Sequence, residues 1–564
     1  MYELRDSGLF YTPTTDSESR FLCGPIQVLG ISRGDNGTKD YGLLVEWKNL
    51  DGICIRKLIP RRRIMNEKSN FVKELLLDTG LVISSRKGVW KPIISYLIQA
   101  RPKQRYKSSA QAGWLNNSFV TPSWCVSNGA EKVIYSGNKS NEFLSTSGTV
   151  SSWQKEVGSL CINNPILAFT VCVGLSAPLL HWLNWPSSGV HLFGKSKISK
   201  TTILILAASL YSGTNFYYTW RATENGLEAT AVEHNDLLLC LDELHQAPPE
   251  VVDQSIYTLA NGLSKMRSNK TITQDDIKNW RLLYLSTGEM GLEEKLAPIQ
   301  KGVKAGQEIR FLEVPVQRKY GAYDELYGHK TMNDFSDSIW KAVKENHGTI
   351  MPKWIEHLSS IDDLSGLLAY RVHELRDKWQ ISKDNNHGSQ VLEAAKRFAL
   401  FGVAGEIAIS AGLMPWPKGF GEHSAKVAFD SWLEMRGSSN DSEDEKLLKE
   451  IPIALKRWRN KLLPEGQPLN DNFGYALDSD GKQAWFLTRQ AFLEGLNIKY
   501  KQQISQAVKF MEEKSWMETS EGRDTFKRVV DGGPKGGRYY KVIPHRITEE
   551  LALDEALSRA AFPC

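Results

Sequence analysis

The sequence has few cysteines and no targeting signal at its start. Seven cysteines occur among 564 residues, and no two of them have CxxC spacing. Neither a disulfide framework nor a zinc site is therefore predicted, and a reducing cytoplasm is the expected location. Residues 1–5 show no basic segment followed by an apolar one, so no secretory signal is predicted.

Long hydrophobic runs are also scarce. The one candidate membrane span is 166–183, a stretch without Asp, Glu, Lys or Arg. It contains Gly174, Pro178 and His181, and its unbroken apolar part is shorter than the roughly 20 residues that a span needs. A buried helix is the favoured interpretation, and no membrane contact is expected.

The excess of charge of one sign is small. The chain has 70 Lys and Arg residues against 65 Asp and Glu residues, a formal net charge of +5. That excess does not by itself indicate a polyanionic partner. Whether one is expected depends on where along the chain the basic residues are concentrated. Hydrophobic residues make up 41% and charged residues 24% of the chain, a balance that excludes a fibrous or wholly disordered protein.

The order of strand-like and helical segments in the sequence predicts a multidomain α/β protein. Residues 1–150 combine strand-like runs with helical pieces near 70–78 and 90–100, which indicates an α+β N-terminal domain. From 151 to 330, buried strands alternate with helices, as in a mostly parallel sheet flanked by helices. The remaining segments are predicted to be a helical region (331–435), a linker and helix (436–481), a small module (482–546) and a C-terminal tail (547–564).

Two features of this layout are open to more than one interpretation. The clearest helix, 390–401, is expected to end near Gly402 or Gly405. Basic clusters at 61–63 and 101–107 are more typical of a solvated surface than of a nucleic-acid site.

The strongest chemical signal is a strand, a polar loop and a helix around residue 200. An apolar strand near 190–193 leads through Gly194 and Ser199 into Lys200, Thr201 and Thr202, which open an apolar helix. This order is typical of a loop that binds phosphates, in which the lysine reaches the β/γ oxygens of ATP and a hydroxyl holds Mg²⁺. The template has glycine where this chain has Ser199, and the added Cβ is either tolerated or weakens binding.

A second motif strengthens this interpretation. The apolar run that begins at Asp236 ends in two adjacent acids, Asp242 and Glu243, which is unusual for a strand buried on both faces. Asp242 is expected to complete the coordination of Mg²⁺, and Glu243 to orient or deprotonate the attacking water. The alternative is a surface loop that happens to begin with Asp-Glu.

Two further strands fit the same sheet. The run 279–289 turns abruptly polar, and its end is expected to deliver a hydroxyl beside the γ-phosphate. The edge-type strand 308–315 carries Arg310, either an arginine that reaches a neighbouring subunit's nucleotide or a solvated residue. Between these elements, a basic hairpin either grips a DNA backbone or is merely solvated; its candidate contact residues are Lys265, Arg267 and Lys270.

Several ordered motifs together resemble a family of ATPases, a domain of unknown function found in prophages, plasmids and cassette-type mobile elements. The matching segments are 191–194, 200–202, 220–228, 241–243, 261–262, 285–289 and 306–310, followed by 397–398, 405–406, 412 and 415–416. The resemblance covers roughly residues 20 to 420. It implies an AAA+ ATPase related to replicative helicases of the minichromosome-maintenance (MCM) type, which work as hexameric rings around DNA.

The same resemblance assigns roles to individual residues. Lys200 and Thr201 would form the Walker A pair, Asp242 and Glu243 the Walker B pair, and Thr287 the sensor-1 position. Arg397 is a guess for sensor 2. Ser199 departs from the family's glycine, which leaves the nucleotide affinity open but not the fold.

The segment 482–546 has the pattern of a winged helix. A strand and a helix near 485–496, a helix at 501–511 and two strands around a Gly-rich turn follow one another. This segment holds 13 Lys and Arg residues against 7 Asp and Glu residues, so the basic excess of the chain is concentrated here. Lys501, Lys535 and Arg538 are its candidate DNA contacts, although many winged helices bind only proteins.

The leading functional hypothesis is an ATP- and Mg²⁺-dependent DNA helicase or translocase that acts in the replication of a mobile element or prophage. The alternative is a nucleotide-dependent DNA-binding switch or scaffold, with a regulatory or defence role and little or no unwinding. DNA and further copies of the chain, in a hexamer, are the expected partners. A separate primase or polymerase is a further candidate partner, because no primase-type carboxylate cluster is apparent.

Overall fold

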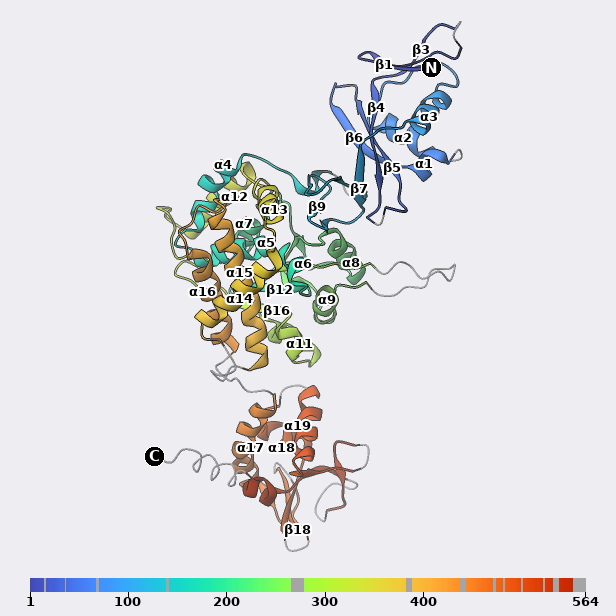
Figure 1. Ribbon diagram of the computed structural model, residues 1–564. Helices are drawn as coiled ribbons and strands as arrows, with labels where there is room; N and C mark the ends of the chain where they lie inside the picture. The colour runs from blue at the N-terminus through green and yellow to red at the C-terminus, as the bar shows by residue number, and fades with distance from the viewer. Residues whose placement is uncertain are drawn as a thin grey trace.

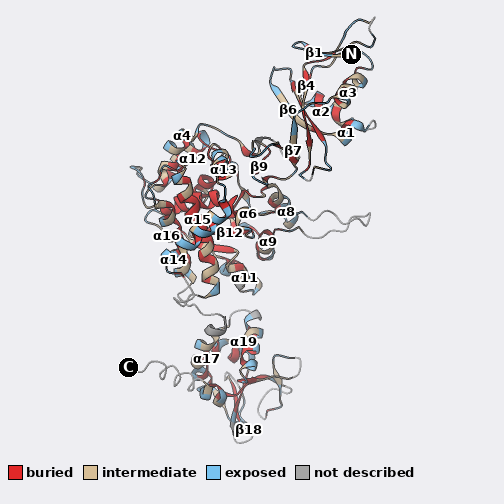
Figure 2. Ribbon diagram, in the orientation of Figure 1, coloured by how far each residue is buried: buried red, intermediate tan, exposed pale blue. Residues whose placement is uncertain are grey.

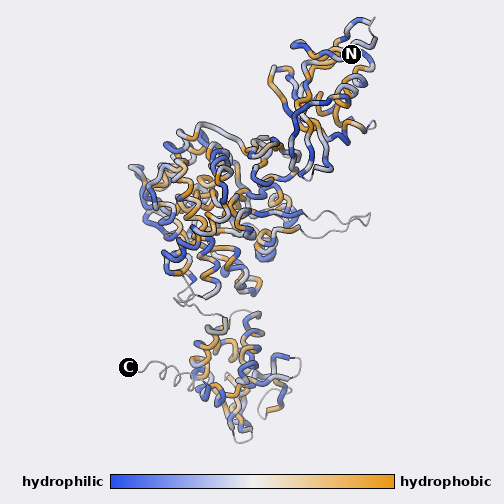
Figure 3. Tube along the Cα trace, viewed as in Figure 1, coloured by the Kyte–Doolittle hydropathy of each residue, from blue (hydrophilic) through white to orange (hydrophobic). Residues whose placement is uncertain are grey.

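The protein consists of three bodies that follow one another along the chain (Figure 1). The computed structural model describes residues 1–550 except 15–16, 36, 67–69, 138–140, 265–277, 382–387, 437–442, 470–472, 480–481, 499–500, 521–522 and 531–536. Hydrophobic and hydrophilic stretches alternate along the trace of all three bodies (Figure 3), and each body has buried residues of its own (Figure 2). The multidomain α/β class predicted from the sequence is confirmed.

The N-terminal body is built on two sheets. One contains β1 (Tyr2–Arg5), β2 (Gly8–Tyr11) and β3 (Arg20–Cys23); the other has the order β11-β7-β4-β5-β6 and contains β4 (Ile26–Arg33), β5 (Gly42–Lys48), β6 (Cys54–Pro60), β7 (Arg105–Ser109) and β11 (Lys132–Tyr135). Three helices cover the larger sheet: α1 (Arg61–Met65), α2 (Phe71–Asp78) and α3 (Trp90–Gln99). Val45, Trp47, Leu76 and Ile93 are among its fully buried side chains, so this body has its own core.

Residues 110–126, here called the connector, lie in sequence between β7 and β11 of this body and pack against the central one. It forms the small sheet of β8 (Gly113–Leu115), β9 (Ser118–Val120) and β10 (Cys125–Val126). Trp114 and Phe119 belong to the core of the central body, not to that of the N-terminal body. The connector is therefore packed as part of the central body although it precedes it in sequence.

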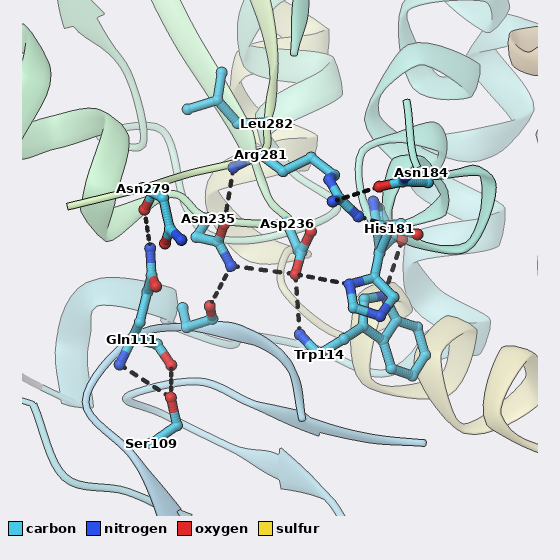
Figure 4. Close-up of polar contacts among 12 residues, drawn as sticks. Ser109, Gln111, Trp114, His181, Asn184, Asn235, Asp236, Asn279, Arg281 and Leu282 are labelled. Carbon is cyan, nitrogen blue, oxygen red and sulfur yellow. Dashed lines mark hydrogen bonds and ion pairs between the residues drawn. The ribbon is translucent and has the colours of Figure 1, made fainter. Parts of the chain in front are cut away.

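A buried carboxylate of the central body, Asp236, lies at the contact with the connector (Figure 4). Asp236 accepts a hydrogen bond from the backbone N–H of Trp114 at 3.0 Å, and the side-chain amide of Asn235 donates to the carbonyl oxygen of Ala112 at 2.8 Å. The second carboxylate oxygen of Asp236, Oδ1, is buried without a hydrogen-bond partner. Burial raises the pKa of Asp236 to about 7.

The same contact reaches the segment that follows the predicted basic hairpin. The side-chain amide of Gln111 donates to the carbonyl oxygen of Asn279 at 2.6 Å, and the backbone N–H of Arg281 donates to Asn235 at 2.8 Å. Arg281 also donates to the carbonyl oxygen of His181 at 3.0 Å (Figure 4). The connector is thus bonded to the residues that lead out of 265–277.

The central body contains a five-stranded sheet with the order β13-β14-β15-β12-β16, in which every neighbouring pair is parallel. Its strands are β12 (Ser188–Phe193), β13 (Tyr218–Thr219), β14 (Leu238–Asp242), β15 (Leu283–Gly288) and β16 (Phe311–Pro315). Val190 and Leu192 face one core and Leu239 and Leu241 another, because successive strand side chains point to opposite faces. The mostly parallel sheet and the edge position of β16 are confirmed.

Helices cover both faces of this sheet. Those before β16 are α4 (Val150–Glu156), α5 (Pro165–Ser176), α6 (Leu179–Leu183), α7 (Lys200–Ala208), α8 (Glu224–Glu233), α9 (Pro249–Asn261), α10 (Leu292–Leu296) and α11 (Ala305–Glu308). Every residue of α5 is buried, so the expectation of a buried segment is confirmed for 166–176. The expectation of one continuous helix over 166–183 is wrong, because the helix breaks before Pro178 and a second, partly buried helix, α6, follows. Within the described ranges, every helix is too short or too polar to cross a bilayer.

The helical continuation runs from α12 to α16. Its members are α12 (Met332–Glu345), α13 (Ile350–Ser359), α14 (Leu364–Lys378), α15 (Ser389–Ser410) and α16 (Phe420–Arg436). The prediction that the helix beginning near 390 ends at Gly402 or Gly405 is wrong, because α15 continues to Ser410. The glycines serve packing: a Cβ on Gly405 would lie 2.5 Å from the sulfur of Cys172 and 3.0 Å from the Cα of Gly421.

The C-terminal body combines a helical layer with a small mixed sheet. Its elements are α17 (Glu443–Arg459), β17 (Leu462–Leu463), β18 (Gly474–Ser479), β19 (Lys482–Leu487), α18 (Arg489–Gly495), α19 (Lys501–Glu513), β20 (Met517–Glu518), β21 (Phe526–Lys527) and β22 (Arg538–Val542). Thr488 caps α18 by accepting from the N–H of Ala491, as its sequence pattern predicts. β21 and β22 pair antiparallel, and Trp458 of α17 is buried in the same core as Phe492.

Candidate nucleotide-binding site

The side chain of Lys200 bonds back to the loop between β12 and α7. β12 ends at Phe193, and α7 begins at Lys200. The ammonium group of Lys200 donates to the carbonyl oxygens of Gly194 at 2.8 Å and Lys195 at 2.6 Å, which holds the side chain against the loop. Desolvation lowers the pKa of Lys200, while the nearby carboxylates of Glu289 and Asp242 act in the opposite direction.

Ser199 takes the place of the template glycine without filling the loop. Its backbone is left-handed, with φ 68° and ψ 28°, a conformation that costs an ordinary residue about 1–2 kcal/mol relative to glycine. Its hydroxyl lies 2.7 Å from that of Ser336 in α12, and Tyr323 makes a further bond to Ser336 at 2.8 Å. The serine side chain is therefore anchored to the helix beside the loop.

The ends of two strands and the start of one helix meet at Asp242. Thr201, in the first turn of α7, donates to Oδ2 of Asp242 at 2.9 Å. Thr287, near the end of β15, donates to Oδ1 of the same carboxylate. The carboxyl ends of parallel strands share one edge of the sheet, which is why residues 45 positions apart in sequence meet here.

This group has the donor chemistry that Mg²⁺ prefers. Mg²⁺ binds oxygen ligands, commonly one or two carboxylates with hydroxyl or phosphate oxygens and waters. Asp242 is buried, with 6% of its surface exposed, and Thr201 presents a hydroxyl 2.9 Å from it. The residues present fit a phosphate-bound divalent cation.

Glu243 lies next to this group but is held differently. Its backbone is left-handed, with φ 60°, at the turn that follows β14, and its N–H donates to Asp242 at 3.0 Å. Its carboxylate accepts a hydrogen bond from the side chain of Gln246. The turn places a half-buried carboxylate at the cavity wall beside Asp242, where it can contact a water molecule.

A cavity of about 710 Å³ unites these residues. Its size falls within the range of sites for small molecules and cofactors, about 300–1,000 Å³. It is lined by Ser196, Lys197, Ile198, Ser199, Lys200, Thr201, Thr202, Asp242, Glu243, His245, Thr287, Gly288, Glu289, Met332, Asn333, Ser336, Asp337 and Trp340. Of the residues predicted to bind nucleotide or metal, all but Gly194 line it, and Gly194 is bonded to Lys200 at its margin.

A buried polar network fixes the strand that carries Thr287. His191 of β12 lies 2.9 Å from the hydroxyl of Ser286, which also accepts from the indole N–H of Trp220 at 2.9 Å. Burial lowers the pKa of His191 to about 4, so the ring is neutral near pH 7. Because Ser286 precedes Thr287, this network sets the position of the hydroxyl that bonds Asp242.

The two arginines considered for catalysis lie outside the cavity. Arg310 donates to the carbonyl oxygen of Gly306 at 3.1 Å, and its guanidinium lies 5.9 Å from the ring centre of Tyr257. Arg397 is buried and paired with Glu393 at 2.9 Å, and desolvation lowers its pKa, with a smaller contribution from Arg310. Neither lines the cavity described above.

Most of the predicted DNA contacts lie outside the described residues. Lys265, Arg267 and Lys270 fall within 265–277, and Lys535 falls within 531–536. Lys501 begins α19, and its side chain is not described. Arg538 begins β22 and is exposed.

Sequence reasoning missed one wall of the cavity. Met332, Asn333, Ser336, Asp337 and Trp340 all come from α12 and lie more than 130 positions from the phosphate loop. The sequence marks α12 only as an amphipathic helix, and no motif ties its polar face to residue 200. Its role becomes visible only when the packing of α12 on α7 is known.

Comparisons with known proteins agree with this fold. Residues 2–279, just under half of the chain, match the family model described as "Domain of unknown function (DUF927)". No curated protein matches the chain in sequence.

Two solved structures align with the chain over most of its length. One is described as "SCCmec type IV Cch - active helicase"; it is 16% identical, the match covers 97% of this chain and 98% of that one, and the TM-score is 0.66. The other is described as "The A form apo structure of NrS-1 C terminal region-CTR"; it is 9% identical over 92% of this chain and 96% of that one, with a TM-score of only 0.32. The first comparison establishes a shared multidomain fold.

Proposed function

We propose that this chain is an ATP-dependent DNA helicase or translocase of the AAA+ MCM-like type that acts in the replication of a mobile element or prophage. The observation that carries the proposal is the convergence of Thr201 and Thr287 on Asp242 beside the lysine of the loop. The strand order of the central sheet, with β12 between β15 and β16, supports an AAA+ arrangement. So does the fold shared with the protein described as an active helicase.

The proposed site divides the work of hydrolysis among its residues. ATP supplies the phosphoanhydride bond that breaks, and bound Mg²⁺ neutralises charge on its phosphate oxygens. Lys200, which bonds to the loop carbonyls in this structure, would bind the phosphate oxygens, and Thr201 with Asp242 would hold the metal. Glu243 accepts a proton from the attacking water or orients it, while Thr287 keeps the carboxylate of Asp242 in place.

A ring would complete the site. Arg310 and Arg397 lie outside their own chain's cavity. In the proposed hexamer, Arg310 reaches the nucleotide of the neighbouring subunit and stabilises the charge that develops during phosphoryl transfer. DNA would thread the ring beside 265–277, and the C-terminal body, proposed as a winged helix, would bind duplex through Lys501, Lys535 and Arg538.

The test is ATP turnover by the full chain with and without single-stranded DNA. Hydrolysis should require Mg²⁺ and rise with DNA, and Glu243→Gln should lower turnover by about 100-fold or more while ATP binding persists. Gln246→Ala is a matched control, since it removes a hydrogen-bond donor to Glu243 but keeps the carboxylate itself. Normal turnover after Glu243→Gln would contradict the proposal.

The alternative, a nucleotide-dependent switch or scaffold, rests on Ser199. A slow switch should bind ATP but release no strand from a forked DNA at any ATP concentration. The anchoring of Ser199 to Ser336 favours the motor, since the serine hydroxyl is bonded to α12 instead of standing free in the loop.

A further inference from the structure

The wall of the cavity formed by α12 has no role in the chemistry described above. The metal-binding and catalytic groups all come from strand ends and α7, whereas five lining residues come from one face of α12. Met332, Ser336 and Trp340 recur at intervals of four along that face, which spans about 12 Å of helix. A wall of this length is comparable to a nucleoside.

Two hydrogen bonds fix this wall against the phosphate loop. The hydroxyl of Ser336 lies 2.7 Å from that of Ser199, and the indole N–H of Trp340 donates to Thr202 at 3.2 Å. Thr202 directly follows Thr201, the metal-binding threonine. Trp340 is therefore placed beside the first turn of α7, just beyond the residues that hold the β- and γ-phosphates.

The order of these residues sets the direction of the ligand. Lys200 and Thr201 take the terminal phosphates and the metal. Asp242, Glu243 and Thr287 occupy the wall at that end of the cavity. The other lining residues fall into three groups: the loop at 196–199, the strand-end residues His245, Gly288 and Glu289 beside the metal-binding group, and α12. The α-phosphate, ribose and base are therefore placed past Thr202 along α12, the wall that lies away from the strand ends and bonds to Thr202 through Trp340.

We propose that α12 recognises the nucleoside part of the nucleotide, with Trp340 as the surface on which the base stacks and Asp337 as the acceptor for the ribose hydroxyls. This inference rests on the proposed function of the site. The indole of Trp340 is half-buried and its N–H is already paired, so the ring is oriented before the base arrives. Asp337 lies three residues earlier and exposed on the cavity wall, and carboxylates are suited to bind ribose hydroxyls.

If the proposal is right, substitutions in α12 change the affinity for nucleotides but not the affinity for phosphate chains that lack a nucleoside. Calorimetric titration of the full chain in Mg²⁺ compares ATP, 2′-deoxy-ATP and inorganic tripolyphosphate. Trp340→Ala should weaken ATP binding by about 10-fold, the scale of a lost base–aromatic stack, and leave tripolyphosphate binding unchanged. Trp340→Phe keeps a ring but loses the bond to Thr202, and it should retain most of the ATP affinity.

The role of Asp337 is tested by comparing the affinities for ATP and 2′-deoxy-ATP, which differ in one ribose hydroxyl. The wild type should prefer ATP over 2′-deoxy-ATP, and Asp337→Asn should remove most of that preference. Lys341→Ala is the matched control, because Lys341 is an exposed residue of the same helix that does not line the cavity, and it should change none of the three affinities.

The possible results distinguish a failure of nucleoside recognition by α12 from a failure of the proposed function as a whole. If Trp340→Ala weakens ATP and tripolyphosphate equally, or Trp340→Phe loses as much ATP affinity as Trp340→Ala, the tryptophan only supports the loop and the proposal fails. Asp337→Asn with an unchanged preference for ribose refutes the second assignment. If the wild type binds neither ATP nor tripolyphosphate, the proposed function itself fails.

Discussion

Replacing Asp236 with asparagine should change how the stability of the connector contact depends on pH. The carboxylate is buried between the connector and the central body, and its pKa rises from 3.8 to about 7 in the folded chain. A folded-state pKa above the unfolded value means that the unfolded chain releases the proton first. The free energy of unfolding is therefore highest below about pH 4, falls as the pH rises to 7, and then levels off.

The magnitude follows from the pKa values. A rise from 3.8 to about 7 corresponds to a penalty of about 4 kcal/mol above pH 7, of which about 1.5 kcal/mol is already present at pH 5. Asp236→Asn has no charge to bury, so its stability relative to the wild type should improve by about 2–3 kcal/mol between pH 5 and pH 8. The amide's unpaired N–H₂ adds a cost that does not depend on pH.

The assay is amide hydrogen exchange, because the Trp114 N–H bonds directly to Asp236. Protection of that amide should rise in Asp236→Asn relative to the wild type as the pH is raised from 5 to 8. His181, whose pKa burial lowers to about 4, titrates in both proteins and largely cancels in the difference. Asp51→Asn, at an exposed hairpin, should show no such trend. A difference that stays flat or shrinks with pH would refute the argument.

Three further substitutions test the site and its support. Thr287→Val removes the hydroxyl bonded to Asp242, and steady-state assays should show turnover reduced by about 100-fold with ATP affinity nearly intact; an unchanged rate would contradict its role. Gly405→Ala forces a Cβ to within 2.5 Å of the Cys172 sulfur and should cost about 1–3 kcal/mol by calorimetry, whereas an unchanged melting temperature would show that α15 can shift freely. Ser199→Gly restores the template residue and should change turnover by less than about threefold, while a rise of 10-fold or more would favour the switch.

The sequence predicts that Lys200 and Asp242 lie at one edge of the sheet, because the signals for this are local. Lys200 and Asp242 each follow an apolar strand, and parallel strands bring such ends together. Their convergence therefore follows from the pattern of strands and helices. The end of α15 is predicted wrongly because Gly405 suggests the end of a helix. In the structure, glycine is needed at this position because neighbouring helices lie too close for a Cβ.

The α12 wall and the connector contact could not be predicted. Trp340 and Asp337 belong to an amphipathic helix whose polar face looks like ordinary surface until it is packed against α7. Asp236 reads as the start of a strand, and nothing local marks it as the partner of Trp114, which lies 122 positions away. Both features depend on tertiary packing between distant segments, which a single sequence does not encode in any short motif.

The position of a bound metal ion decides whether Lys200, Thr201 and Asp242 form a nucleotide site. A structure of the chain with Mn²⁺ and a non-hydrolysable ATP analogue, read by its anomalous signal, would locate the cation. We expect a single strong peak within coordination distance of the Thr201 hydroxyl, with Asp242 beside it and the terminal phosphates against Lys200. A peak elsewhere, or an analogue that binds outside the cavity between α7 and α12, would contradict this expectation.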